Sequence, residues 1–278
     1  MKIKLNNGVE MPQIGYGVYQ VSPDECERCV SDALKVGYRM IDTAQAYNNE
    51  EGVGAAIAKS EIPRNELFIV SKIWISNYGY DKARKSIDES LRKLGTDHID
   101  LMLLHQPYCD RYGAYRALED AYKEGKLRAI GVSNFYPDHF IDLAENVEII
   151  PAVNQIETHV FNQQTIARKY MEEFGTRVMS WGPLAEGRNN LFTNPVLEKI
   201  GQKYGKSVAQ VALRWLTQLG IIIIPKSVHI ERMEQNLDIL DFTLSESDMA
   251  EIALLDTGKS LFFDHHDPET VKMFMGWR

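Results

Sequence analysis

The chain has 278 residues, of which 44% are hydrophobic and 25% are charged, and its formal net charge is −8. These proportions are ordinary for a folded globular protein and exclude a fibrous repeat or a largely disordered chain. The acidic balance also argues against a broad nucleic-acid surface, because such a surface needs a basic face.

The chain opens with a turn signal, because Asn7-Gly8 lies between the short apolar segments 2–5 and 9–13, which predicts a β-hairpin. Strand-like and helical patterns then alternate to residue 237. The predicted strands are 16–19, 40–44, 68–73, 99–105, 129–133, 152–157, 177–181 and 221–226. The predicted helices are 23–36, 49–59, 81–94, 115–124, 137–145, 163–174, 195–204, 208–219 and 230–237.

Eight strands, each followed by at least one helix, predict an α/β fold of the (β/α)8 TIM barrel type. Near-continuous apolar runs such as 101–104 are typical of parallel strands that are covered on both faces. A doubly wound open sheet is the alternative. The connections are short and leave no linker, so we interpret residues 1–278 as a single barrel domain.

Asp42, Tyr47, Lys72 and His105 lie at or just after the C-terminal ends of three successive predicted strands. In a parallel barrel these ends meet at one surface, so we expect the four side chains to share a pocket. Lys72 would favour proton release from the Tyr47 phenol, and Asp42 would keep that lysine charged. A neutral His105 would orient a carbonyl group or donate the proton itself. Each residue taken singly also has a purely structural interpretation.

The sequence motifs of several other classes of enzyme are absent. Gly15-Tyr-Gly17 and Gly52-Val-Gly54 have no third glycine, so the Rossmann fingerprint is absent, as are the P-loop and the Gly-x-Ser-x-Gly elbow. His265-His266 has no third ligand at a characteristic spacing, so the sequence predicts no metal.

Three cysteines cannot make a disulfide framework, and we interpret Cys26 and Cys29 as reduced helix residues. The longest aliphatic run, 221–224, is far below the roughly 20 residues of a membrane helix. The N-terminus has no apolar signal core, so we expect a cytoplasmic protein.

Four segments resemble the aldo-keto reductase family, in the family's order and at its usual spacing, and the similarity runs to about residue 260. The segments are GYRMIDTAQAY at 37–47, LRKLGTDHIDL at 91–101, IGVSNF at 130–135 and IPKSVHIERMEQN at 224–236. The resemblance implies that Asp42, Tyr47, Lys72 and His105 are the catalytic tetrad. It also implies an NADPH-dependent reductase of aldehydes and ketones, with the cofactor extended across the barrel mouth.

By the same resemblance, Ser133, Asn134 and Gln155 hold the nicotinamide carboxamide. Trp181 stands where the family usually stacks a tyrosine, and an indole offers a larger face. The segment that follows matches the part of the family that lies along the pyrophosphate. The other implied cofactor contacts are Gly182, Pro183, Leu184, Lys226, Ser227, Arg232, Gln235 and Asn236.

Lys226, Ser227 and Arg232 form a compact anion site, which suits the 2′-phosphate of NADPH and predicts a preference over NADH. Gln235 and Asn236 match adenine contacts, although a solvated helix face is an equal interpretation.

The expected walls of the substrate pocket are Tyr19, Trp74 and Tyr108, together with a short C-terminal tail over the barrel mouth. The tail from Lys259 is aromatic and short for the family, which indicates an open pocket that accepts varied carbonyl compounds.

Two alternatives to the reductase remain at this stage. One is a nucleotide-binding regulatory or scaffold protein on the same fold, with weak or no turnover, and the other is a barrel hydrolase or isomerase that uses His105. We expect a monomer that binds a small carbonyl substrate and neither nucleic acid nor a membrane.

Overall fold

The protein is described by a computed structural model that covers all 278 residues. Eight parallel strands form one sheet in the order β10-β9-β8-β7-β6-β5-β4-β3. Their bounds are β3 (Tyr16–Gly17), β4 (Met40–Asp42), β5 (Phe68–Ile73), β6 (Leu101–Leu104), β7 (Ile130–Ser133), β8 (Val153–Glu157), β9 (Arg177–Trp181) and β10 (Ile222–Ile223).

The sheet curls until its first and last strands meet. The amide of Gly15 donates to the carbonyl of Ile223 at 2.8 Å, and the amide of Ile223 donates to the carbonyl of Gln13 at 2.9 Å. A Cβ atom on Gly17 would lie 2.9 Å from the carbonyl oxygen of Ile224, so glycine permits the close approach at this seam. The predicted (β/α)8 barrel is therefore confirmed, and the open doubly wound sheet is excluded.

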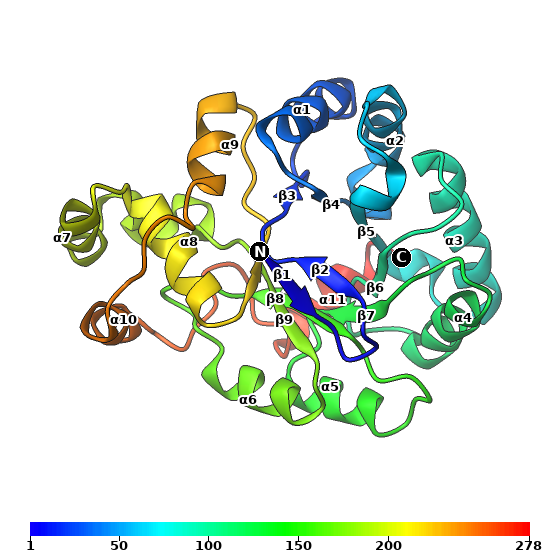
Figure 1. Cartoon of the computed structure of the whole chain (residues 1–278). Helices are drawn as coiled ribbons and strands as arrows, with labels where there is room; N and C mark the ends of the chain where they lie inside the picture. Colours follow the sequence, from blue (N-terminus) through cyan, green and yellow to red (C-terminus); the bar gives the residue numbers. More distant parts are fainter.

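Helices surround the strands (Figure 1). Their bounds are α1 (Pro23–Val36), α2 (Glu50–Lys59), α3 (Tyr80–Leu94), α4 (Arg111–Lys123), α5 (Pro137–Ala144), α6 (Thr165–Glu173), α7 (Pro195–Tyr204), α8 (Val208–Gln218), α9 (Ile230–Leu237), α10 (Glu246–Ala253) and α11 (Pro268–Met275). Short 3₁₀ segments follow β4, β5 and β9, namely η1 (Gln45–Tyr47), η3 (Ile75–Asn77) and η4 (Ala185–Thr193), and η2 (Arg64–Glu66) lies between α2 and β5. No helix is both long enough and apolar enough to cross a membrane.

Two hydrophobic clusters hold the barrel together. The larger one lies between the sheet and the surrounding helices, and the smaller one fills the barrel interior. The predicted hairpin, β1 (Lys2–Lys4) paired with β2 (Glu10–Pro12), contributes Leu5 and Met11 to the interior cluster. It lies across one end of the barrel, whereas α11 lies on the far side (Figure 1). The hairpin therefore leaves only the opposite end of the barrel free to open.

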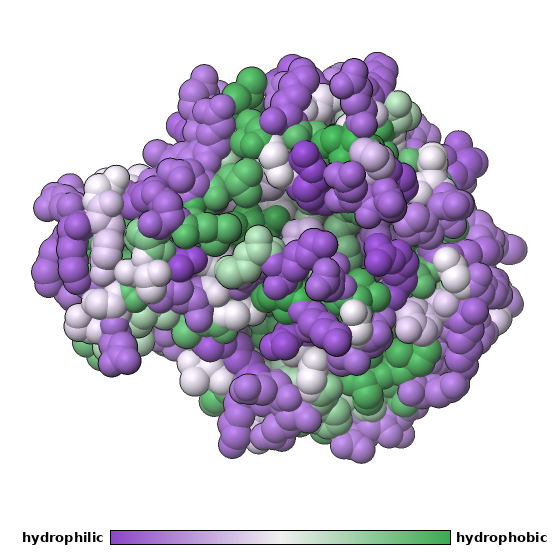
Figure 2. Space-filling model, in the orientation of Figure 1, coloured by the Kyte–Doolittle hydropathy of each residue, from purple (hydrophilic) through white to green (hydrophobic).

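The face on the hairpin side is edged by hydrophilic residues, with hydrophobic ones showing in patches between them (Figure 2). This distribution fits a surface that meets water, since apolar atoms always contribute part of such a surface.

The structure departs from the predicted elements mainly at their ends. Helix α4 begins at Arg111 rather than at residue 115, because the side chain of Asp110 accepts a hydrogen bond from the amide of Gly113 and caps the helix earlier. Strand β10 is only Ile222–Ile223, shorter than the predicted 221–226. Helices α10 and α11 were not predicted. Cys26 and Cys29 are buried and unpaired on α1.

Candidate active site

A cavity of about 690 Å³ opens at the C-terminal ends of the strands, opposite the hairpin. The ends of β4, β7, β8 and β9 and the segment after β6 contribute its polar lining. This is the surface at which a parallel barrel brings together residues that are distant in the sequence.

Lys72 is fully buried at the floor of this cavity, on β5. Its Nζ donates to Oδ1 of Asp42 at 2.7 Å, to the carbonyl oxygen of Thr43 at 2.8 Å and to the hydroxyl of Tyr47 at 3.2 Å. Three acceptors match the three N–H groups of an ammonium ion, so Lys72 is fully hydrogen bonded and held in one place. The predicted contact of Lys72 with both Asp42 and Tyr47 is present.

The pKa of Tyr47 lies well above its ordinary value, because the surrounding protein desolvates this half-buried phenol and because the Asp42 carboxylate and the Tyr19 phenol lie nearby. The Lys72 charge, which the sequence suggests as a means of lowering this pKa, does not outweigh desolvation and the Asp42 charge. Burial lowers the pKa of Lys72, and the charge of Asp42 opposes that shift. The phenol of Tyr47 is therefore protonated at neutral pH and is hydrogen bonded to the Lys72 ammonium.

His105 follows β6 and lines the same cavity. Its ring meets the Tyr47 ring edge-on at 5.6 Å and the Trp74 ring at 5.1 Å. Its Nδ1 is buried without a hydrogen-bond partner. Burial, with the Lys72 charge, holds the pKa of His105 well below its usual value, so the imidazole is neutral, as the sequence predicted.

Four predicted cofactor residues form a connected hydrogen-bond network on the cavity wall. Asn134 donates from Nδ2 to Oγ of Ser133 at 3.2 Å and accepts at Oδ1 from Nε1 of Trp181 at 2.8 Å. Ser133 donates to the carbonyl of Gln155 at 2.8 Å, and Gln155 donates to Oδ2 of Asp42 at 2.8 Å. These four residues are therefore joined through Asp42 to Lys72 in one continuous hydrogen-bond network.

The remaining predicted cofactor residues divide into two groups. Gly182, Pro183, Leu184 and Lys226 line the cavity. The others lie outside that lining, on the segment before α9 or along α9 itself: Ser227, Arg232, Gln235 and Asn236. In this second group Ser227 and Asn236 are buried, whereas Arg232 and Gln235 are exposed. Arg232 is exposed and forms no ion pair.

The substrate side of the cavity is aromatic. Tyr19 and Trp74 line it, and Tyr108 does not. The hydroxyl of Tyr108 instead donates to the carbonyl of His265 at 2.7 Å, and its ring packs against Phe274. Tyr108 thus packs against the C-terminal tail, and residues of the tail line the cavity in its place.

The family model described as "Aldo/keto reductase family" matches residues 5–256. The chain belongs to this family. It is 47% identical over 255 residues to a glyoxal reductase of Bacillus subtilis, covering 91% of this chain and 92% of the relative. An aldo-keto reductase from a Medee basin deep-sea metagenome library has a similar structure, with 42% identity and a TM-score of 0.93 over 95% of this chain and 98% of the other.

A further solved structure is the Bombyx mori aldo-keto reductase in complex with NADP. It has 33% identity and a TM-score of 0.90, over 98% of this chain and 96% of that chain.

Two anchors of the tail in this aldo-keto reductase were not predicted. The buried carboxylate of Glu157 accepts hydrogen bonds from Oγ of Ser260 at 2.5 Å and from the amide of Leu261 at 2.9 Å. At the other end, Nε1 of Trp74 donates to the carbonyl of Trp277 at 3.1 Å. Neither anchor has a sequence signal, because Glu157 and Ser260 are far apart in the chain and the second anchor involves a backbone carbonyl.

The cavity suits a nicotinamide nucleotide. It has an indole face, serine and amide groups at one side, and Lys226 at the rim, and its volume falls within the usual range for ligand pockets. Arg188 extends from the η4 segment over the Phe262 ring at 4.2 Å and donates to the carbonyl of Leu261 at 2.7 Å. The η4 segment, which lines the cavity through Glu186, Arg188 and Phe192, therefore contacts the tail directly.

Proposed function

We propose that this aldo-keto reductase uses NADPH to reduce aldehydes and ketones to alcohols, with Tyr47 as the general acid. The observation that supports this most strongly is the position of the Lys72 ammonium, which contacts both the Asp42 carboxylate and the Tyr47 hydroxyl at the cavity floor. Such a contact stabilises the negative charge that develops on the phenol as it gives up its proton.

The chemistry that NADPH supplies when bound is a hydride for the carbonyl carbon. The residues that would hold its nicotinamide end are Ser133, Asn134, Gln155 and Trp181, all of which line the cavity. Lys226 at the rim, with Ser227 and Arg232 beyond it, would take the phosphate groups, since cations and a hydroxyl suit that anion.

The proton comes from the protein. Tyr47 is protonated at neutral pH because its pKa is raised, and it gives its O–H proton to the carbonyl oxygen. The phenolate that remains is stabilised by the hydrogen bond from Lys72. A neutral His105 beside Tyr47 can donate a hydrogen bond to the same oxygen and fix its direction. Hydride on carbon and proton on oxygen together make the alcohol.

The similarity to a glyoxal reductase supports small aldehydes and dicarbonyl compounds as the first substrates to test. The aromatic substrate side, with Tyr19 and Trp74, also accepts larger apolar groups. We expect activity on several carbonyl compounds rather than strict selection of one.

Loss of NADPH absorbance with glyoxal, an aromatic aldehyde and a bulky ketone tests the proposal. Tyr47→Phe should lower turnover by roughly 10²–10⁴-fold, the usual contribution of a general acid, while the NADPH dissociation constant changes less than about twofold. The matched control is Tyr115→Phe, because Tyr115 is a buried tyrosine whose hydroxyl bonds the carbonyl of Ile149 away from the cavity. NADPH binding without consumption of any substrate would instead favour the regulatory or scaffold role.

A further inference from the structure

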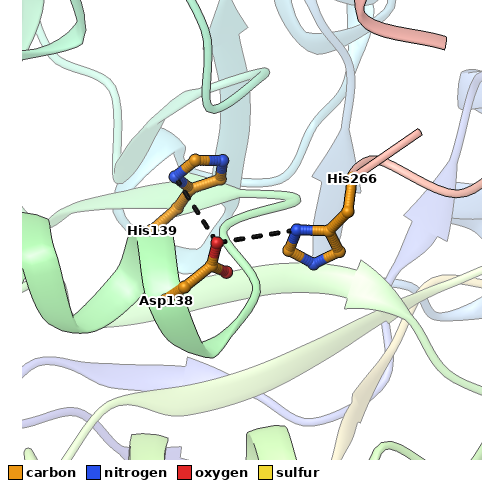
Figure 3. Close-up of side chains that lie close together, drawn as sticks. All are labelled: Asp138, His139 and His266. Carbon is orange, nitrogen blue, oxygen red and sulfur yellow. Dashed lines mark ion pairs between the residues drawn. The ribbon is translucent and has the colours of Figure 1, made fainter. Parts of the chain in front are cut away.

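Three potential metal ligands lie together outside the cavity, on the surface where the C-terminal tail crosses α5 (Figure 3). Asp138 and His139 lie in the first turn of α5, and His266 lies in the tail just before α11. One ligand atom from each lies within 4.8 Å of the others. Oδ2 of Asp138 is 3.5 Å from Nδ1 of His266 and 4.0 Å from Nδ1 of His139.

We propose that Asp138, His139 and His266 bind one divalent transition-metal ion of the zinc type, which joins the C-terminal tail to α5. Two imidazole nitrogens and one carboxylate oxygen, with a water molecule as fourth ligand, are a common ligand set for Zn²⁺. Mg²⁺ and Ca²⁺ prefer oxygen ligands alone, so the two histidines select against them.

The three side chains are free for this role. None of them forms a hydrogen bond with a protein group beyond the cluster, and Asp138 and His266 are exposed while His139 is half-buried. The two imidazole rings lie nearly parallel, 20° apart, at 6.0 Å. Two ligands of a tetrahedral zinc ion lie about 3.3 Å apart, so the side chains must close by at most about 1.5 Å. Rotation of the exposed side chains of Asp138 and His266 covers that distance.

The local charge favours a cation despite the helix terminus. The free N–H groups at the start of α5 disfavour a positive ion, and the carboxylate of Asp138 in that first turn offsets them. Arg111, which lies near His139, is paired with Asp142. On the tail, the carboxylate of Asp264 accepts a hydrogen bond from the backbone amide of His266 at 2.9 Å. It brings a second negative charge beside the cluster.

The bound ion would fix a part of the tail that contacts the substrate side of the cavity. His265, next to His266, is buried, and its Nε2 lies 3.1 Å from Oε1 of Gln106, which lines the cavity. The ring of His265 also stacks on Phe274, another lining residue, at 5.8 Å. The metal therefore acts as a removable cross-link between α5 and the tail, and this inference does not depend on the proposed reaction.

Calorimetric titration with Zn²⁺ tests the site. The background carries Cys109→Ser, because Cys109 is an exposed thiol that competes for zinc, whereas Cys26 and Cys29 are buried. We expect one Zn²⁺ per chain, and a loss of affinity of about tenfold or more in His139→Gln and in His266→Gln, since even outer-sphere changes at metal sites cost that much. The matched control is His98→Gln, because His98 lies 2.6 Å from Asp97 but has no second imidazole in a cluster.

Proteolysis of the tail gives a second readout. Zn²⁺ should slow cleavage within residues 259–278 by severalfold in the Cys109→Ser protein and in the His98→Gln control, and should have no effect in His266→Gln. Zinc affinity that is unchanged by the loss of either histidine, equal binding of Mg²⁺, or no binding at all would each overturn the proposal.

Discussion

The side-chain amide of Gln155 donates a hydrogen bond of 2.8 Å to Oδ2 of Asp42, while Oδ1 of the same carboxylate accepts from Lys72 at 2.7 Å. Gln155 belongs to the proposed cofactor wall, and Asp42 belongs to the proposed catalytic group. The proposed cofactor residues and the proposed catalytic residues therefore share the buried carboxylate of Asp42. A substitution of Gln155 should for this reason also alter the hydrogen bond between Asp42 and Lys72.

Gln155→Leu should lower the free energy of unfolding by about 1.5–3 kcal/mol, because it removes a charge-assisted hydrogen bond to a buried carboxylate. It should also raise the NADPH dissociation constant about tenfold. Urea denaturation and fluorescence titration measure the two effects. The control is Gln13→Leu, since buried Gln13 bonds the carbonyls of Thr217 and Ile221 near the hairpin end. That variant should lose stability and keep its NADPH affinity, and a parallel loss of affinity would contradict the assignment of Gln155.

Lys72→Met should cost about 3–5 kcal/mol of folding free energy, because the Asp42 charge is then buried without its partner. The double variant Lys72→Met, Asp42→Asn removes both charges and should recover most of that loss. Neither variant should recover turnover, since the support for the Tyr47 phenolate is gone. Thermal unfolding and NADPH consumption separate the two properties. Recovery of turnover in the double variant would show that Lys72 acts only through stability.

The pH dependence of stability should carry a contribution from His105. Its pKa in the folded protein is well below the ordinary value, so below about pH 6.5 the unfolded chain binds a proton that the folded protein does not. The contribution of His105 to the free energy of unfolding is therefore fully present above that pH. It falls as the pH decreases, by up to about 1.4 kcal/mol per pH unit for one group. His105→Gln should flatten the fall between roughly pH 6.5 and 5. Denaturation of both proteins over that range measures the difference, and identical slopes would contradict it.

Lys226→Ala and Arg232→Ala should each raise the NADPH dissociation constant about tenfold and leave that of NADH nearly unchanged, because a lost charge-assisted contact to phosphate is worth about 1.5–3 kcal/mol. Lys85→Ala is the control, since Lys85 is exposed on α3 and far along the chain from both sites. Fluorescence titration with both nucleotides gives the ratio. Equal weakening of NADH binding would mean that the two cations do not contact the 2′-phosphate.

The barrel and the grouping of Asp42, Tyr47, Lys72 and His105 could be predicted because parallel strands fix where their C-terminal ends meet. In a parallel barrel, residues at the C-terminal ends of different strands lie near one another because of the topology alone. The shift of the Tyr47 pKa could not be predicted in the same way, because it depends on the degree of burial and on the Asp42 charge at short range.

Contacts across the tail could not be predicted either. Asp138 and His266 are separated by most of the second half of the chain, so their spacing carries no signal. Tyr108 does not lie on the pocket wall as the sequence predicts, because its hydroxyl is hydrogen bonded to the carbonyl of His265 and its ring packs against Phe274 in the tail. The path of a tail over a barrel depends on side-chain packing, which local sequence patterns do not describe.

The two anchors of the tail, at Glu157 and at Trp74, hold both ends of a segment whose middle forms part of the cavity wall. Between the anchors the segment also contacts Tyr108 and Gln106 through His265, but none of its residues is hydrogen bonded to Lys72 or Asp42. Such an arrangement makes the segment an exchangeable part, which evolution or an engineer can replace to reshape one wall of the cavity while the buried pair of Lys72 and Asp42 is left intact.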